Sequence, residues 1–284
     1  MKLTILGGGG FRTPLVYRAL LGDTSPHRIS DVALYDVDAA RLLAVRRVLD
    51  AMAAGHPEAP VVRAGTDLDE ALEGADFVFS AVRVGGLAGR TADERVALDL
   101  GLLGQETVGP GGISYGLRTV PVALDIARRV TRLAPEAWVI NFTNPAGLVT
   151  EAMASVLGDR VVGICDSPIA AARRVMTLLG VDEREAEVDY VGLNHLAWVR
   201  DGRVGDDARF PAALDVWRAG PDNPFTSTAP DDLRMLLNPY LQYYYETGRV
   251  LEAQRRTPSR ASVVAAVETE LMVLYADPSV VWEP

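Results

Sequence analysis

The chain has 284 residues with 49% hydrophobic and 23% charged side chains, which is typical of a folded globular protein with a sizeable core. Its formal net charge of −10 argues against nucleic acid and anionic membranes as main partners. No run reaches the ~18 apolar residues that span a bilayer, and the N-terminus enters a strand pattern without the features of a signal peptide. The single cysteine, Cys165, excludes an intrachain disulfide, so we expect a cytoplasmic protein.

Short apolar strands alternate with helical patterns over the first 166 residues. Strands are expected at 3–6, 32–35, 61–62, 77–82, 138–140 and 161–164, and helices from 13 onward and at 41–54, 69–72, 90–100, 119–133 and 146–157. Residues 77–82 are almost wholly apolar, as a strand covered on both faces requires. This alternation predicts an α/β fold with a doubly wound, Rossmann-like parallel sheet in a domain over residues 1–166.

The pattern changes beyond residue 180, and a smaller α+β domain is expected over residues 167–284. A strand is predicted at 187–193, and residues 196–204 are predicted to begin a hairpin around Asp201-Gly202. Residues 205–230 are rich in Pro, Gly and Asp and are predicted to be irregular. Helices are expected at about 231–247 and 259–276.

A run of four glycines separates the first strand from the first helix, which starts at Thr13-Pro14. Without a Cβ, the backbone amides of this run can approach a pyrophosphate, and the helix N-terminus adds a favourable dipole. Asp36 ends the second strand, where a carboxylate can accept hydrogen bonds from an adenosine ribose and so favours NAD over NADP. The alternative is a tight turn without cofactor. The predicted cofactor-binding residues are Gly7, Gly8, Gly9, Gly10, Phe11, Arg12, Asp36 and Arg41.

Polar side chains also follow other predicted strands, whose carboxyl ends face the ligand crevice of an open α/β sheet. Cys165-Asp166 and His195 end two such strands, and a thiolate with an imidazole can hold a divalent metal. One cysteine and one histidine are no metal motif, however, and single cysteines are usually buried apolar residues. Arg83 and Asn144 follow two further strands, where an arginine can bind a phosphate or carboxylate through two hydrogen bonds. A surface ion pair is the alternative for Arg83.

Four tyrosines crowd the six positions 240–245, and Tyr240, Tyr243 and Tyr244 share one helical face. Such clusters mostly serve packing. A tyrosine close to a metal or cation can instead act as a base.

Together these segments resemble glycoside hydrolase family 4, and most closely its 6-phospho-β-glucosidases. The shared segments, in chain order, are Gly7-Gly8-Gly9-Gly10 with Thr13-Pro14, Arg83-Val84-Gly85-Gly86, Gln105 to Gly112, Asn144-Pro145, Gly163-Ile164-Cys165-Asp166, Gly192-Leu193-Asn194-His195 and Tyr240 to Tyr244. Each segment alone is weakly specific, whereas the ordered set over nearly the whole chain is specific.

The resemblance implies hydrolysis of 6-phospho-β-glucosides by a route that differs from the scheme with two carboxylates. Bound NAD+ would oxidise carbon 3 of the sugar transiently, which acidifies the proton at carbon 2. A divalent metal, typically manganese, would stabilise the resulting enediolate as a Lewis acid. The aglycone would then be eliminated, water would add, and the NADH formed would reduce carbon 3 again. The implied substrate is a phosphorylated disaccharide or aryl glucoside, and the implied assembly is a homo-oligomer, a dimer or a tetramer.

The resemblance also assigns residues to these roles. Cys165 and His195 match the metal ligands, and Tyr243 is placed as the base that removes the carbon 2 proton. Tyr240 and Tyr244 remain alternatives for the base because the tyrosine run leaves the register open.

Three further matches concern the substrate. Arg83, Asn144 and Asn194 match positions at which the substrate binds. Asp166 matches the acid of α-acting members, whereas many β-acting relatives have asparagine there. Both the role of Asp166 and the anomeric preference therefore stay open.

Two departures from the family pattern leave alternatives open. Gly10-Phe11-Arg12 replaces the usual glycine-serine run, although a related form occurs among the 6-phospho-β-glucosidases. The sequence also stops at Pro284, where family members usually continue, so we expect either a shortened member or a sequence that lacks its end. The alternatives are an NAD-dependent 2-hydroxy acid dehydrogenase of the malate type, with a histidine paired to an aspartate and no metal, and an inactive nucleotide-binding protein.

Overall fold

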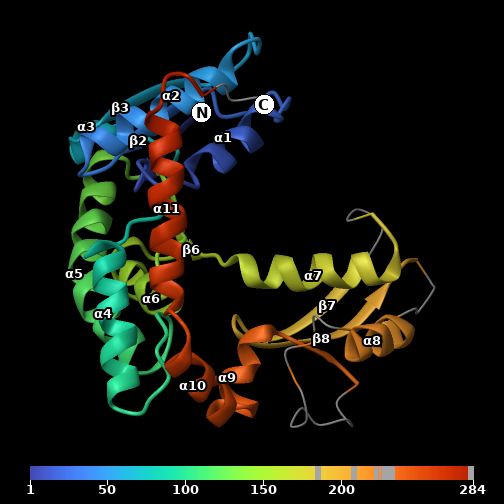
Figure 1. Cartoon of the computed structure of the whole chain (residues 1–284). Coiled ribbons are helices and arrows are strands. Elements are labelled where there is room, and N and C mark those ends of the chain that lie inside the picture. The colour runs from blue at the N-terminus through green and yellow to red at the C-terminus, as the bar shows by residue number, and fades with distance from the viewer. Residues whose placement is uncertain (183–186, 206–209, 221–222, 224, 226–233, 281–284) are drawn as a thin grey trace. The chain divides into compact units, whose positions relative to one another are not determined.

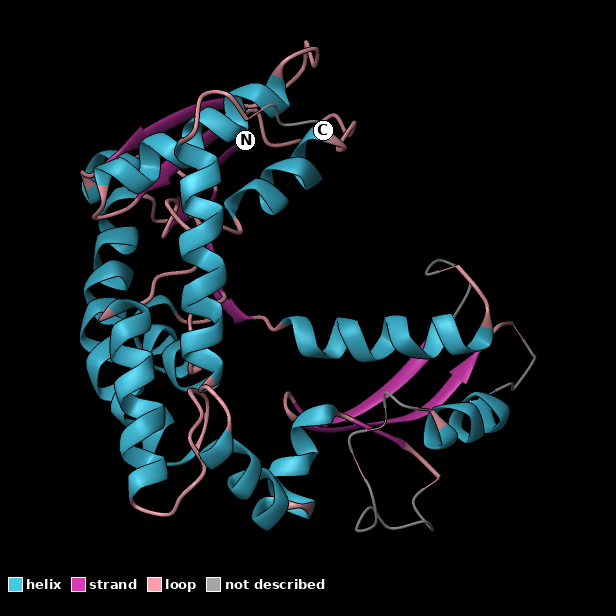
Figure 2. Ribbon diagram, viewed as in Figure 1, coloured by secondary structure: helices cyan, strands magenta, loops and turns pink. Residues whose placement is uncertain are grey.

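The computed structural model describes residues 1–182, 187–205, 210–220, 223, 225 and 234–280 (Figure 1). They form two compact units: a first unit of Met1–Ile164 with Pro258–Pro284, and a second unit of Cys165–Thr257. Helices alternate with strands along most of the chain (Figure 2). Within the described part of the chain, no helix is both long and apolar enough to cross a bilayer.

A parallel sheet of six strands forms the centre of the first unit. The strands are β1 (Lys2–Leu6), β2 (Asp31–Tyr35), β3 (Val61–Gly65), β4 (Phe77–Ser80), β5 (Trp138–Asn141) and β6 (Val161–Gly163). Their order across the sheet is β3-β2-β1-β4-β5-β6, the order of the doubly wound dinucleotide-binding fold. The predicted Rossmann-like sheet is confirmed. The strand order reverses between β1 and β4, and ligands of such sheets bind at the carboxyl ends of the strands at that point.

Helices cover both faces of the sheet because successive strand residues point to opposite sides. Ile5 packs in a buried cluster with residues of α1, α2 and α11, whereas the adjacent Leu6 packs with residues of α3, α5 and α6. The helices of the first unit are α1 (Thr13–Leu21), α2 (Ala39–Ala53), α3 (Leu68–Leu72), α4 (Gly86–Asp99), α5 (Gly109–Leu133), α6 (Ala146–Leu157) and α11 (Arg260–Ala276).

Two helices begin a full turn or more before their predicted starts. α4 starts at Gly86 rather than near residue 90, and α5 starts at Gly109 rather than near residue 119. α5 continues through Pro121, which lies inside the helix, twelve residues after its first residue Gly109. Its buried face includes Tyr115 before this proline and Ile126 after it. Burial of that face therefore outweighs the hydrogen bond that the proline removes.

The C-terminal helix α11 belongs to the first unit, which differs from the expected domain ranges 1–166 and 167–284. Tyr275 is buried in the same cluster as Leu49 of α2, and the Arg47 guanidinium donates to the carbonyl oxygen of Tyr275 at 2.7 Å. Apolar residues such as Val267 and Leu274 remain exposed on other sides of the helix. Because its apolar residues point in several directions, the pattern of α11 does not indicate which unit it packs against.

The second unit combines helices with a three-stranded antiparallel sheet in the order β7-β8-β9. Its elements are α7 (Asp166–Leu179), β7 (Glu187–Leu193), β8 (Leu196–Arg203), α8 (Phe210–Ala219), β9 (Leu236–Leu237), a 3₁₀ turn (Pro239–Leu241), α9 (Gln242–Tyr245) and α10 (Thr247–Arg256). A core of its own, with Val175, Trp217 and Leu241 among its members, lies between α7, α8 and the sheet. The predicted smaller α+β part is confirmed as a fold class.

The predicted hairpin turn at Asp201-Gly202 is wrong. The strands β7 and β8 pair from Leu193 with Leu196 onward, so the turn is Asn194-His195. Asn194 has a φ of 47°, a left-handed conformation that asparagine tolerates better than most residues. Asp201 and Gly202 instead lie inside β8, opposite Asp189 and Val188 of β7.

Two further expectations fail between residues 205 and 247. Helix α8 occupies part of the stretch predicted to be irregular, and it buries Phe210, Leu214 and Trp217 at helical spacing. The predicted helix at 231–247 is replaced in its described part by β9, the 3₁₀ turn and the single turn α9. Asn238 caps this turn through its side chain, and Pro239 follows it in the first position, so the backbone cannot continue as one helix.

Candidate active site

The glycine run after β1 forms a cradle of bare backbone at the switch point of the sheet. Gly7 has a φ of +81°, and a Cβ on it would lie 2.6 Å from the carbonyl oxygen of Ala81. A Cβ on Gly8 would lie 2.8 Å from Cβ of Leu34. The amides of Gly7 and Gly8 both donate to the carbonyl oxygen of Tyr35 at the end of β2, at 2.9 and 2.8 Å. Side chains are thus excluded from the loop, and its backbone can approach a pyrophosphate closely.

Helix α1 begins directly after this loop. Arg12 is the N-cap residue and gives no side-chain hydrogen bond to the first turn, and Pro14 lies in that turn. The Arg12 guanidinium carbon lies 5.7 Å from the centre of the Phe11 ring, and the Phe11 carbonyl oxygen accepts a 2.9 Å hydrogen bond from the Tyr275 hydroxyl of α11. A glycine cradle that leads into a helix N-terminus without a side-chain cap fits a dinucleotide pyrophosphate.

Asp36 and Arg41 both contact the glycine loop. Oδ2 of Asp36 accepts from the Gly9 amide at 3.0 Å, and Nε of Arg41 donates to the Gly9 carbonyl oxygen at 3.2 Å. Arg41 also forms a 2.7 Å ion pair with Glu268 of α11. The structure therefore brings the predicted loop residues, Asp36 and Arg41 together, and it adds Glu268, which lies 227 positions further along the chain than Arg41.

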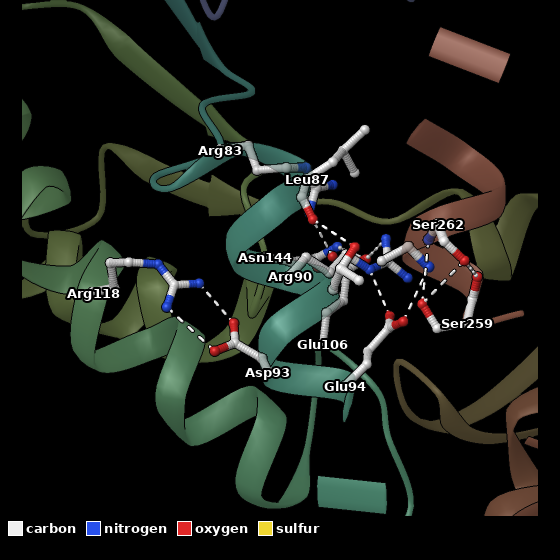
Figure 3. Close-up of polar contacts among 12 residues, drawn as sticks. Arg83, Leu87, Arg90, Asp93, Glu94, Glu106, Arg118, Asn144, Ser259 and Ser262 are labelled. Atoms are coloured by element: carbon white, nitrogen blue, oxygen red, sulfur yellow. Dashed lines mark hydrogen bonds and ion pairs between the residues drawn. The ribbon is translucent and has the colours of Figure 1, made fainter. Parts of the chain in front are cut away.

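A second group of site residues follows β4 and β5, and Glu106 joins them (Figure 3). Nη1 of Arg83 lies 2.7 Å from Oε2 of Glu106, and Nδ2 of Asn144 donates to Oε1 of the same carboxylate at 3.1 Å. Nη1 of Arg90 completes the group at 2.9 Å from Oε1. The predicted substrate residues Arg83 and Asn144 are thus brought together, and the ion pair that was the alternative for Arg83 is present.

The Glu106 group continues to the start of α11. Nε of Arg90 lies 2.8 Å from Oε1 of Glu94, and Oε2 of Glu94 accepts from the backbone amide of Ala261 at 3.0 Å (Figure 3). Glu94 is only 1% exposed, so water cannot compensate its charge. Among the described contacts, the guanidinium of Arg90 and the amide of Ala261 compensate it. The sequence analysis gave neither Glu94 nor Glu106 a role. Glu106 lies in the shared segment Gln105 to Gly112, which was the available signal, whereas nothing in the spacing of Glu94 distinguishes it from a surface carboxylate.

Electrostatics keep Arg83 charged. Burial by itself lowers the pKa of Arg83, but the negative charge of Glu106 beside it acts the other way and the pKa ends above its usual value. The guanidinium carbon also lies 5.7 Å from the centre of the Tyr115 ring. About a third of the Arg83 side chain, 32%, stays exposed, so it can contact an anionic ligand while Glu106 fixes its position.

Replacing Glu106 by glutamine tests this group. The change leaves Arg83 without its carboxylate and weakens one of the two ion pairs of Arg90, so we expect the free energy of unfolding to fall by about 3 kcal/mol, the usual cost of breaking a buried pair. Denaturant titration measures this fall. In the control Glu136→Gln, which removes a 96% exposed carboxylate, the midpoint should not change. Equal midpoints for both variants would contradict the role of Glu106.

In the second unit, Cys165 and His195 lie in direct contact. Cys165 precedes the first turn of α7, His195 lies in the β7–β8 turn, and Sγ and Nε2 are 3.3 Å apart. Burial raises the pKa of the Cys165 thiol. A thiolate sulfur and an imidazole nitrogen at this separation can bind one divalent ion. In the described parts of the chain no group of three or more His, Cys, Asp or Glu residues could hold a metal. The pair would thus leave open positions for substrate oxygens, as catalytic sites do.

The tyrosine segment packs against this pair. The rings of Tyr240 and His195 are stacked, with centres 3.6 Å apart and an angle of 3° between their planes. The Tyr243 ring lies 5.8 Å from the Tyr240 ring, whereas Tyr244 is 51% exposed. Oδ1 of Asp166 lies 3.7 Å from Sγ of Cys165. The structure therefore links all five predicted catalytic and metal residues through neighbouring contacts.

Asn238 holds this arrangement and was missed by the sequence. Its Nδ2 donates to the Ser167 hydroxyl at 2.7 Å and lies 3.0 Å from the Tyr190 hydroxyl, and its Oδ1 accepts from the Tyr240 amide at 3.0 Å. The Tyr190 hydroxyl in turn donates to the carbonyl oxygen of Asn194 at 2.7 Å. The signal that could have found Asn238 is the Asn-Pro pair that caps the turn before the tyrosines.

Asn194 has a buried side-chain oxygen, Oδ1, that accepts no hydrogen bond from the residues that the structure describes. Leaving a buried acceptor unpaired costs about 1–3 kcal/mol, and such an atom is therefore suited to contact a ligand. This is compatible with the predicted substrate role of Asn194.

Comparison with known proteins agrees with this geometry. The model of the "Family 4 glycosyl hydrolase" family matches residues 2–181, and that of the "Family 4 glycosyl hydrolase C-terminal domain" matches residues 190–283. The 6-phospho-beta-glucosidase of Escherichia coli (strain K12) is 35% identical over 306 residues, which cover all of this chain and 67% of that protein. The 6-phospho-alpha-glucosidase 1 of Lacticaseibacillus paracasei is also 35% identical, over 93% of this chain and 64% of its own length.

A solved structure shows the same fold. The 6-phospho-beta glucosidase of Thermotoga maritima, determined with manganese, NAD+ and glucose-6-phosphate, superposes with a TM-score of 0.91 at 28% sequence identity. The match covers all of this chain and 69% of that one. The chain thus spans about two thirds of the length of the proteins that it resembles.

Proposed function

The chain belongs to family 4 of the glycosyl hydrolases, and we propose that it hydrolyses 6-phospho-β-glucosides with bound NAD+ and a divalent metal, of which manganese is the first candidate. The observation that carries the proposal is the 3.3 Å contact between Sγ of Cys165 and Nε2 of His195. A dehydrogenase of the malate type needs no metal, whereas the thiol of Cys165 and the imidazole of His195 together fit a divalent ion. The relatives whose names specify 6-phospho-glucosidases support the substrate class.

Each cofactor has a place that fits it. The glycine loop and the start of α1 would hold the NAD+ pyrophosphate, with Asp36 on the ribose side. Cys165 and His195 would hold the metal. When bound, NAD+ supplies a reversible hydride acceptor for carbon 3 of the sugar, and the metal supplies Lewis-acid stabilisation of negative charge.

The remaining roles fall to side chains of this protein. We propose that Tyr243 removes the carbon 2 proton, which becomes acidic once carbon 3 is a ketone, and that Asp166 gives a proton to the leaving aglycone oxygen. Water would then add, with its hydroxyl at carbon 1 and a proton returned to carbon 2 by Tyr243, and reduction of carbon 3 is the chemistry that the cofactor would supply. Arg83, held by Glu106, and the amides of Asn144 and Asn194 would bind the phosphorylated sugar.

The anomeric preference is proposed to be β. Relatives with both preferences are 35% identical to this chain, so identity does not separate them. Asp166 matches the position of the acid in α-acting members, which favours the α form. The β form is favoured by the match to a 6-phospho-beta-glucosidase over the whole chain, against 93% of it for the 6-phospho-alpha-glucosidase. Parallel assays with the α and β forms of p-nitrophenyl glucoside 6-phosphate decide between them, and a higher kcat/KM for the α form would reverse this proposal.

Omitting one cofactor at a time tests the proposed function. We expect release of p-nitrophenol from the β substrate to fall to background without NAD+, and again after EDTA dialysis without Mn²⁺, with no net NADH formed in the complete mixture. Hydrolysis that survives without NAD+ would contradict the mechanism. Net NADH formation from 2-hydroxy acids would instead favour the dehydrogenase.

A further inference from the structure

Three charged groups lie around the ribose side of the glycine cradle: Asp36, Arg41 and Glu268. Asp36 and Arg41 contact the amide and the carbonyl of Gly9 respectively, and Arg41 pairs with Glu268 at 2.7 Å. The side chains of Arg41 and Glu268 are only 31% and 22% exposed, so water screens this pair incompletely. Two carboxylates and one guanidinium give the group a formal charge of −1.

This arrangement bears on the choice between NAD and NADP, which differ by one phosphate on the adenosine ribose. An arginine just after the second strand is what sites for NADP use to hold that phosphate. Arg41 has the position for it, at the start of α2, but its guanidinium is already bound to Gly9 and Glu268.

Asp36 alone is a weak barrier to the extra phosphate. Its Oδ2 accepts the Gly9 amide at 3.0 Å and its Oδ1 accepts the Asp38 amide at 3.2 Å. These two donors compensate part of its charge. Repulsion between Asp36 and the ribose phosphate therefore accounts for only part of the preference for NAD over NADP. The remaining part depends on whether the Arg41 guanidinium can reach that phosphate.

We infer that Glu268 is a specificity-determining residue that excludes NADP by holding Arg41 away from the ribose phosphate. This inference rests on the proposed use of NAD+. It gives α11 a function in cofactor selection, although the residue lies far along the chain from the glycine loop.

Glu268→Gln tests the inference by equilibrium binding of NAD+ and NADP+, measured by calorimetry at low ionic strength, where charge effects are least screened. Binding is the right readout because the charge of Glu268 also acts on Arg83, so turnover would mix two effects. We expect the Kd for NADP+ to fall about tenfold, as one new charge-assisted hydrogen bond from Arg41 to the phosphate would produce, and the Kd for NAD+ to change less than about threefold. The control Glu270→Gln removes an exposed carboxylate of the same helix and should change neither Kd.

A double-mutant cycle of Glu268→Gln and Arg41→Ala measures the coupling between the two side chains, so the test does not depend on the stability of a single variant. In an Arg41→Ala background, Glu268→Gln should no longer improve NADP+ binding, because there is no guanidinium to release. A gain of the same size in that background, or no gain in the single variant while NAD+ still binds, would overturn the inference alone. Failure of the unmodified protein to bind NAD+ would instead overturn the proposed function.

Discussion

Cys165→Ser is expected to lower the affinity for Mn²⁺ at least 100-fold and to remove metal-dependent hydrolysis. Changing a residue that only orients a metal ligand costs about 10–100-fold in metal affinity, and Cys165 is proposed as a ligand itself. Its thiol contacts His195 at 3.3 Å, and a serine hydroxyl is a poorer ligand because it stays protonated at neutral pH. Electron paramagnetic resonance of free Mn²⁺ during a titration measures the affinity directly.

Two further variants make this result specific. His195→Ala should show a loss of similar size, because it removes the other of the two residues proposed to hold the metal. Ser167→Ala keeps the thiol and the backbone amide that donates to it at 3.5 Å, and should leave the affinity within about threefold. Unchanged Mn²⁺ binding in Cys165→Ser would exclude this residue as a ligand.

The first unit could be predicted well because its signals are local. Most strands of its sheet contain a short run of buried apolar residues, and the four glycines Gly7 to Gly10 lie together in the loop after β1, where a Cβ would meet backbone or side-chain atoms. The same rules failed at Asp201-Gly202, a typical turn pair that lies within β8. Nothing local separates that pair from Asn194-His195, since the choice depends on which register buries Val199 and Ala197.

The residues of the candidate site also include some that the sequence could predict and some that it could not. Cys165 and His195 could be predicted as a pair from strand ends and from the resemblance, although they lie 30 residues apart. Glu106 and Glu268 could not, because their importance comes from contacts with Arg83 and Arg41 that only the folded chain creates. Glu106 lies in the segment between α4 and α5, and Glu268 lies in α11. In either setting a carboxylate has the same local pattern whether it faces water or an arginine from another element.

The positions of the three candidate tyrosines in the second unit indicate which of them we expect to act as the base. The Tyr240 ring is stacked on His195 at 3.6 Å, which suits a residue that orients the imidazole. Tyr244 is 51% exposed, and a base exposed to water gains little from a nearby cation. Tyr243 lies beside Tyr240, with ring centres 5.8 Å apart, and is less exposed than Tyr244. We therefore expect Tyr243 to be the base.

Tyr243→Phe should slow exchange of the carbon 2 proton with solvent deuterium by about 10²–10⁴-fold, the usual contribution of a positioned base. Nuclear magnetic resonance of glucose 6-phosphate products formed in D₂O measures the exchange. Tyr240→Phe keeps the ring that stacks on His195 and should cost less than about tenfold, and Tyr244→Phe should cost less than about twofold. Because all three variants remove only a hydroxyl, loss of exchange in Tyr240→Phe with retention in Tyr243→Phe would assign the base to Tyr240 and leave Tyr243 a packing role.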